Sequence, residues 1–310
     1  GAAAGGAGAR RAPLARRRAE VWQLLLGYLP ANRARRAGQL GKRRAEYAAA
    51  VRQYFHVREQ DRTAQEQGLL HQILVDVPRT YPDIPLLQQA PVQRLMERVL
   101  YVWGLRHPAS GYVQGISELI CPFILVFISD YLEEGQEPET VDVERLPAEA
   151  LAAVEADCYW CATKLLDRVQ DHYTAEQPGI QRMLLRLDDL LRRVDAPLHA
   201  HLREQGVHAQ QFGVQWMNNL LLRELPVRVA VRAWDTCLSQ EGGFDAFHVH
   251  LCAALLIHFS DKLQQLDMIG LMEFFQNMPT QEWTPKDIEP LLSQAYIYST
   301  LFDDSPNHLG

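Results

Sequence analysis

Residues 91–106 read PVQRLMERVLYVWGLR, and this stretch indicates the fold class. Its apolar side chains recur every three or four residues, which places them on one face of an α-helix. The residues that share this spacing are Val92, Leu95, Met96, Val99, Leu100, Val102 and Trp103. The spacing predicts one helix over 91–106 with a buried face.

The same period recurs along the chain. Residues 180–194 (IQRMLLRLDDLLRRV) repeat it, and residues 245–258 are apolar on nearly every side, as in a central helix of a large helical domain. Thr284 and Pro285 are typical of an N-cap followed by proline, so a helix is expected to begin there. No stretch alternates β-branched and polar residues, so strands are not expected. The sequence also lacks an internal repeat of fixed period, which argues against a helical solenoid. We therefore expect an all-α fold of many short helices with no sheet.

The longest apolar run, Leu119 to Ile128, is too short to cross a bilayer. It has ten residues, whereas a transmembrane helix needs about 20. Glu118 and Asp130 flank it, and Pro122 lies inside it. The run therefore predicts a buried, kinked core helix and no membrane span.

The charge is unevenly distributed. The 310 residues carry a net charge of −7, but residues 1–60 hold 13 Lys and Arg against 3 Asp and Glu. Such a basic start can contact nucleic acid or an anionic membrane, or it can be a solvated helix face. Nucleic-acid binding is disfavoured because the rest of the chain is acidic and no aromatic residues interleave with the basic run.

Composition also divides the chain. Residues 1–13 are mostly Gly, Ala and Arg, and they predict a flexible tail before a domain over 14–310. Residues 129–145 hold seven Asp and Glu against one Arg, which predicts an exposed and mobile acidic loop. The cysteine count is five, and an odd number fits a reducing cytosol better than a disulfide framework.

The signatures of common cofactors are missing. The sequence has no Walker loop, dinucleotide fingerprint, His-Glu-x-x-His motif or nucleophile elbow. Cys158 and Cys161 have no second pair to complete a zinc site. Two histidine pairs are spaced two residues apart, which places their members on nearly opposite helix faces: His199/His201 and His248/His250. We expect no cofactor or metal held by the chain itself.

Two short motifs carry the functional hypothesis. The first is ILVDVPR, from Ile73 to Arg79, and the second is GYVQGI, from Gly111 to Ile116. Taken alone, Arg79 could simply pair with Asp76 at a helix end. Gln114 could likewise cap the helix that follows it.

Together the two motifs resemble those of TBC-domain Rab GTPase-activating proteins. That family carries Ile-x-x-Asp-x-x-Arg and, some thirty-five residues later, Tyr-x-Gln, and this chain has both in that order. Val113 departs from the pattern, because many members have Cys there. Other landmarks extend the resemblance over residues 16–309, and the last two are similar to the member-twenty-two branch: LLLGYLP at 24–30, Trp216, RELP at 223–226, RAWD at 232–235, QNMP at 276–279 and SPNH at 305–308.

The resemblance implies a V-shaped, all-α domain over 14–310. An N-terminal lobe over about 14–195 would carry both motifs, and a C-terminal lobe would cover about 196–310. It also implies that the chain accelerates GTP hydrolysis by a Rab-family GTPase. Arg79 would stabilise phosphoryl charge and Gln114 would position the attacking water, while Asp76 would hold Arg79 and Tyr112 would support the loop of Gln114.

The implied partner is a GTP-bound Rab protein, which itself holds the GTP and Mg²⁺. The chain would supply catalytic residues in trans without turning over a substrate of its own. A cytoplasmic location is implied, with peripheral association on Golgi or other endomembranes left open. The alternative is a helical scaffold that binds Rab GTPases without catalysis.

Overall fold

The computed structural model describes residues 14–133, 135–174 and 176–302, and these residues form helices and turns without a strand. The predicted all-α class is confirmed. The expected tail over 1–13 and the SPNH landmark at 305–308 lie outside the described residues.

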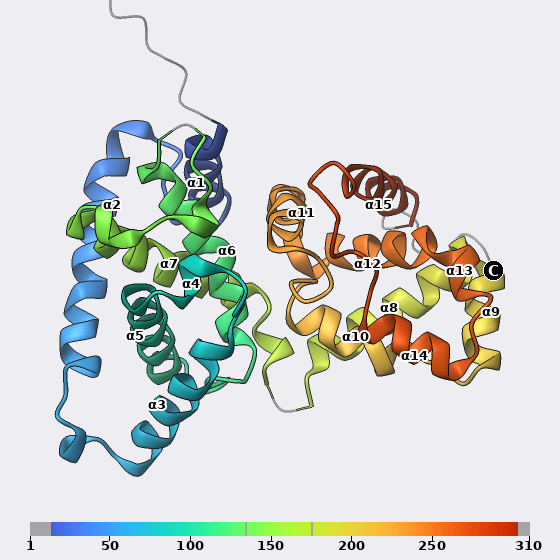
Figure 1. The fold of residues 1–310 in the computed structure, drawn as a ribbon, viewed down its shortest axis with the longest axis horizontal. Helices are drawn as coiled ribbons and strands as arrows, with labels where there is room; N and C mark the ends of the chain where they lie inside the picture. The colour runs from blue at the N-terminus through green and yellow to red at the C-terminus, as the bar shows by residue number, and fades with distance from the viewer. Residues whose placement is uncertain (1–13, 134, 175, 303–310) are drawn as a thin grey trace, which may run out of the picture.

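The helices fall into two lobes arranged as a V (Figure 1). One lobe contains α1 (Leu14–Leu25), α2 (Arg33–Ala50), α3 (Ala64–Asp76), α4 (Pro85–Gln88), α5 (Ala90–Arg106), α6 (Ile116–Ile128) and α7 (Ala148–Arg168). The other contains α8 (Pro178–Val194), α9 (Ala196–Glu204), α10 (Ala209–Asn218), α11 (Val227–Ser239), α12 (Phe247–His258), α13 (Ser260–Leu263), α14 (Met268–Gln276) and α15 (Glu289–Phe302). Short turns connect them: the π-helical turn η1 (Val51–Phe55) and the 3₁₀ turns η2 (Glu59–Asp61), η3 (Val77–Arg79), η4 (Ser129–Tyr131), η5 (Pro138–Thr140), η6 (Val143–Arg145), η7 (Gln170–His172) and η8 (Gly243–Asp245).

The helices predicted from periodicity are present as α5, α8 and α12. Every apolar residue of the 91–106 pattern is buried in α5. α12 buries residues on all its sides, from Phe247 to Leu256, as its sequence predicts. α6 includes the predicted apolar run, begins three residues earlier and continues through Pro122. Among the described helices, none combines the length and hydropathy needed to cross a membrane.

The helix start expected at Thr284 is wrong. The Asp287 carboxylate accepts hydrogen bonds from both the backbone N and the hydroxyl of Thr284, each at 2.7 Å. These bonds lower the pKa of Asp287 and close a turn instead of a helix. The last helix, α15, begins at Glu289.

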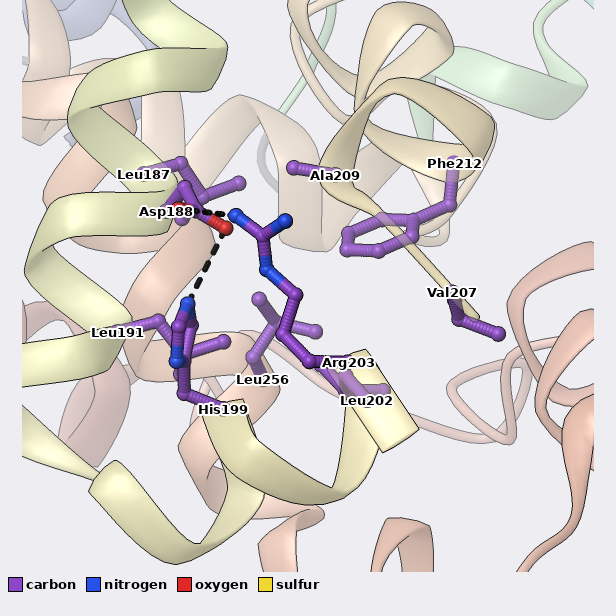
Figure 2. Close-up of a pocket in the computed structure, with 10 residues that line it drawn as sticks. All are labelled: Leu187, Asp188, Leu191, His199, Leu202, Arg203, Val207, Ala209, Phe212 and Leu256. Atoms are coloured by element: carbon purple, nitrogen blue, oxygen red, sulfur yellow. Dashed lines mark hydrogen bonds and ion pairs between the residues drawn. The ribbon is translucent and has the colours of Figure 1, made fainter. Parts of the chain in front are cut away.

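The contacts of α8 show that the second lobe begins with this helix. α8 packs against α9, α10 and α12, so the neighbours change between α7 and α8, earlier than the expected division at about residue 195. Asp188 of α8 bridges to α9 through Arg203 at 2.9 Å and His199 at 3.3 Å (Figure 2). The hollow beside them holds about 10 Å³, which is room for about one water molecule. His199 therefore has a packing role here.

An aromatic cluster joins the two lobes. The indole of Trp22 stacks on that of Trp234 with ring centroids 6.0 Å apart, and Phe123 packs edge-on against both rings. Asp235 accepts hydrogen bonds from Trp22 Nε1 at 2.8 Å and from Arg18 Nε at 3.1 Å. The first helix of one lobe is thus bound to α11 of the other.

Most of the acidic segment 129–145 lies at the surface, but it is attached at several points. Val143 is buried, and the Gln89 carboxamide donates to the Val141 carbonyl and accepts from the Val143 backbone N–H. Arg228 of the other lobe pairs with Glu139. Its predicted mobility stays a prediction.

Candidate functional site

The first motif forms the end of α3 and the turn η3. Thr63 and Glu66 form a capping box that starts α3. Pro78 removes one backbone donor, and the chain tightens into a 3₁₀ turn that ends at Arg79. The Arg79 side chain is exposed, and it has no hydrogen bond or ion pair to any residue that the structure describes. Its guanidinium is therefore available to a partner.

The second motif forms the loop between α5 and α6. Gly115 occupies the N-cap of α6 with φ of +100°, a region that favours glycine. Gln114 does not cap the helix, because the N-cap is Gly115 and no side chain bonds there. The Gln114 side chain is exposed and has no hydrogen-bond partner within residues 14–133, 135–174 and 176–302.

Two hydrogen bonds join the motifs. Tyr112 Oη donates to Asp76 Oδ2 over 2.9 Å, and Thr80 Oγ1 donates to Ser117 Oγ over 2.9 Å. Burial and the Asp76 charge both raise the pKa of Tyr112, which keeps its hydroxyl a donor. The expected contact between Asp76 and Arg79 is not found in the described part of the chain, since the Asp76 carboxylate bonds to Tyr112 instead. Each motif thereby fixes the position of the other.

The second lobe reaches this site through Arg223. Its Nε and Nη2 donate to the Glu118 carboxylate, with the shortest distance 2.6 Å. Arg223 lines two hollows, of about 320 and 330 Å³. Gln114 lines the first, and the segment that follows Arg79, from Tyr81 to Ile84, lines the second.

Arg223 and Glu118 were missed as site residues by sequence reasoning. They are 105 residues apart in sequence, so no local motif contains both. The one available signal was that Arg223 belongs to RELP, a landmark of the family resemblance.

The backbone near this junction is strained. Tyr81, Leu220 and Leu221 have φ of +47°, +54° and +64°, although they carry side chains. Such residues cost about 1–3 kcal/mol each and persist where their surroundings hold them. Leu220 and Leu221 are buried, and Tyr81 Oη donates to Leu222 O over 2.9 Å. The strain therefore lies on both sides of the contact between the lobes.

A buried carboxyl group lies behind the hollow that Gln114 lines. Glu224 is 4 % exposed, and Gln215, which lines that hollow, donates to its Oε1 over 2.8 Å. Burial raises the pKa of Glu224 to about 7. Its Oε2 has no hydrogen bond from a described residue.

The remaining candidates for chemistry are core residues. The five cysteines are buried and unpaired, and burial raises the pKa of Cys158 and Cys161 well above its usual range. Both therefore stay neutral thiols. His248 Nε2 contacts the Trp216 carbonyl at 2.9 Å, and His201 Nε2 contacts the Leu266 carbonyl at 2.8 Å. The described residues contain no group of three His, Cys, Asp or Glu that could hold a metal ion.

Known proteins are similar to this chain in sequence. The sequence model of the Rab-GTPase-TBC domain matches residues 15–264. TBC1 domain family member 22B of Homo sapiens is 46 % identical over 289 residues, which are 93 % of this chain and 56 % of that protein. GTPase-activating protein gyp1 of Schizosaccharomyces pombe is 46 % identical over 291 residues, with the same two coverages. The chain thus spans little more than half the length of these relatives.

Solved structures share the fold. The crystal structure of the Ypt/Rab-GAP domain of Gyp1p superposes with a TM-score of 0.84 and 42 % identity, covering 94 % of this chain and 90 % of that chain. The Chlamydomonas flagellar RabGAP TBC domain has a TM-score of 0.64 at 19 % identity, covers 92 % of this chain and 81 % of that one, and supports the fold alone. From the sequence match, the helical architecture and these relatives together, the chain belongs to the Rab-GTPase-TBC domain family.

Proposed function

We propose that this chain accelerates GTP hydrolysis by a Rab-family GTPase, with Arg79 and Gln114 supplied in trans. One observation carries the proposal. Arg79 and Gln114 are exposed and have no partner among the described side chains, yet their segments are joined by the Tyr112–Asp76 and Thr80–Ser117 bonds. Two free polar groups on a fixed frame suit catalysis on a partner's substrate. The name of the gyp1 relative, a GTPase-activating protein, agrees with this activity.

Arg79 is suited to charge stabilisation. Phosphoryl transfer spreads negative charge over the phosphoryl oxygens, and a guanidinium is permanently charged with a planar fork of donors. Because no described carboxylate holds Arg79, the residue gives up no ion pair when the GTPase arrives. In Ras, an arginine supplied in this way accelerates hydrolysis by about 10³–10⁵.

Gln114 is suited to positioning water. A carboxamide both donates and accepts, so it can hold a water molecule and contact a phosphoryl oxygen at once. The position of Gln114 directly before Gly115 and α6 restricts its backbone while leaving the side chain free. The 320 Å³ hollow beside it offers room for a segment of the GTPase.

The partner in this proposal is a GTP-bound Rab protein, which brings the GTP and Mg²⁺, so the chain needs no cofactor of its own. The chain would act at the membrane surface that carries the Rab protein. It would be cytoplasmic and associate peripherally with Golgi or other endomembranes.

Single-turnover GTP hydrolysis across a panel of loaded Rab proteins tests the proposal. Arg79→Ala and Gln114→Ala should each abolish most of the stimulation, and Arg79→Lys should rescue little because lysine lacks the planar fork. Arg94→Ala, which removes another exposed arginine, is the matched control. Binding of Rab without any stimulation by the unaltered chain would favour the scaffold alternative instead.

A further inference from the structure

A groove on the first lobe lies apart from the proposed catalytic residues. It has a volume of about 630 Å³ and is bounded by α2, the end of α7 that begins the helix, and α5. Much of its wall consists of methyl groups, from Ala45, Ala48, Ala152, Ala153 and Ala156. Val51, Tyr47 and two acidic residues, the exposed Glu149 and the buried Glu155, also line it. This volume lies within the range of about 300–1,000 Å³ typical of ligand sites.

Two arginines of the groove are held in place by buried carboxylates. Arg44 donates to Asp157 through Nε and Nη2, at 2.9 and 2.7 Å, and Arg98 donates likewise to Glu155, at 2.7 Å for both bonds. Both carboxylates are less than 10 % exposed. Arg44 also interacts with Tyr131, whereas Nη1 of Arg98 makes no hydrogen bond within the described chain, so the Arg98 guanidinium can still donate to a ligand.

Arg52 and His56 lie at the end of the groove where α2 becomes the π-helical turn η1, and Arg52 adds a positive charge there. Arg52 and His56 line the groove, are exposed and have no side-chain hydrogen bond or ion pair to the residues that the structure places. A π-helical turn is rare and often occurs at functional sites. Here the wide turn directs Val51 and Arg52 to the groove while Phe55 packs on Tyr101 of α5, 5.6 Å between ring centroids.

The α2 wall of the groove is the positive side of an acidic protein, whereas the α7 wall carries Glu149 and Glu155. Residues 33–52 contain seven Lys and Arg and one Glu, whereas the whole chain has a net charge of −7. α2 lies at the outer edge of its lobe, on the side away from the second lobe (Figure 1). A negatively charged surface would therefore attract this edge and repel the rest of the molecule.

We propose that this groove binds an anionic phospholipid at a membrane surface. The phosphate contacts Arg52, His56 and the free Nη1 of Arg98, and part of an acyl chain lies along the alanines. A lipid fits better than a peptide, because the walls are helix faces whose backbone groups are already bonded within α2 and α7. Such walls recognise an aliphatic chain by shape and cannot bond to a peptide backbone. The proposal uses no residue of the catalytic site and holds whether or not the chain stimulates a GTPase.

Flotation of the protein with phosphatidylcholine vesicles, with and without phosphatidylserine, tests this inference. The unaltered protein should float only with the anionic vesicles. Ala48→Trp fills the groove without changing the charge, and its control is Ala49→Trp, since Ala49 is exposed on the same helix but does not line the groove. Ala48→Trp should weaken binding about tenfold, which corresponds to excluding about two methylene groups.

Charge reversal gives a second arm. Arg52→Glu should weaken binding about 25-fold, from about fivefold for each unit of charge. Lys286→Glu makes the same change of net charge on an exposed cation of the other lobe and should have little effect. Thermal unfolding checks that each variant is folded, and Ala152→Trp replaces Ala48→Trp if that variant is not.

Three results would overturn the proposal. The first is no flotation of the unaltered protein with anionic vesicles, which would leave an acidic peptide as the better occupant. The second is unchanged vesicle binding by a folded groove-filling variant. If only Arg52→Glu lost binding, the protein would be held by general charge attraction to the membrane and not by the groove. The third is an equal loss in Ala49→Trp.

Discussion

Replacing Tyr112 by phenylalanine tests the frame that joins the two motifs. The change removes one hydroxyl and keeps a ring that is 8 % exposed, so the packing is preserved. The lost bond is the 2.9 Å donation to Asp76 Oδ2. Hydrogen bonds to charged groups contribute about 1.5–3 kcal/mol. Because Asp76 is only half-buried and water can replace the hydroxyl, we expect the free energy of unfolding to fall by the lower figure, about 1.5 kcal/mol.

The effect on catalysis should exceed a loss of stability alone. The Thr80–Ser117 bond still joins the segments, so Arg79 and Gln114 should remain near each other but less restricted. A misplacement of about 1 Å can cost about 10²-fold in rate. With one bond of two kept, we expect about a tenfold lower kcat and little change in KM, since the docking surface is unaltered.

The assay is stopped-flow GTP hydrolysis by a loaded Rab protein, with Tyr296→Phe as the control because Tyr296 is an exposed tyrosine of α15. The same change is then made in an Arg79→Ala background. If Tyr112 acts by positioning Arg79, its removal should cost much less there, since residues that act as a unit are not additive. A Tyr112→Phe protein with full activity, or with the same loss in both backgrounds, would refute the reasoning.

Three other predictions follow from the site. Gln114→Ala should raise the barrier to GTP hydrolysis by about 2.7–4 kcal/mol. A Rab protein whose own switch glutamine is changed to leucine should lose at most about tenfold of the stimulation. If the Rab change proved the more damaging of the two, Gln114 would be structural and the mechanism would use a single arginine finger. Complexes with GDP-loaded Rab should tighten with aluminium fluoride, because the two side chains act on the transition state; equal affinity by calorimetry would favour the scaffold. Burial raises the pKa of Glu224 from its usual 4.5 to about 7. Between pH 4.5 and pH 7 the folded state therefore keeps a proton on this carboxyl group that the unfolded state has lost. Its contribution to stability is therefore fully present below about pH 4.5 and falls by about 3 kcal/mol as the pH rises to 7. Glu224→Gln should remove this fall in urea titrations, and an unchanged pH profile would contradict the burial argument.

Helices with a strong apolar face could be located from sequence. α5, α8 and α12 were predicted within two residues because burial of one face, or of every face, sets their composition. The start of α15 was misplaced because the same Thr-Pro pair that can begin a helix can also form a side-chain turn. Only the position of Asp287 decides between them, through its two bonds to Thr284.

The site was predictable only in part, for a related reason. Arg79 and Gln114 lie in short local motifs, so their sequence context is enough to single them out. The hydrogen-bond partner of Asp76 depends on which side chain lies near it in the fold. Arg79 was expected because it is close in sequence, but the structure shows a bond to Tyr112, 36 residues away. The Arg223–Glu118 pair spans the two lobes, and no local pattern in either segment predicts it.

The aromatic contact between α1 and α11 is expected to form late in folding. Trp22 and Asp235 are 213 residues apart in sequence, so their bond closes a loop that contains most of the chain. Closing such a loop costs entropy before its contacts give any return, and folds rich in distant contacts form slowly. We therefore expect each lobe to gain secondary structure first and the Trp22, Phe123 and Trp234 rings to meet late. A chain cut between α7 and α8 would divide this cluster, so neither half should be a stable protein by itself.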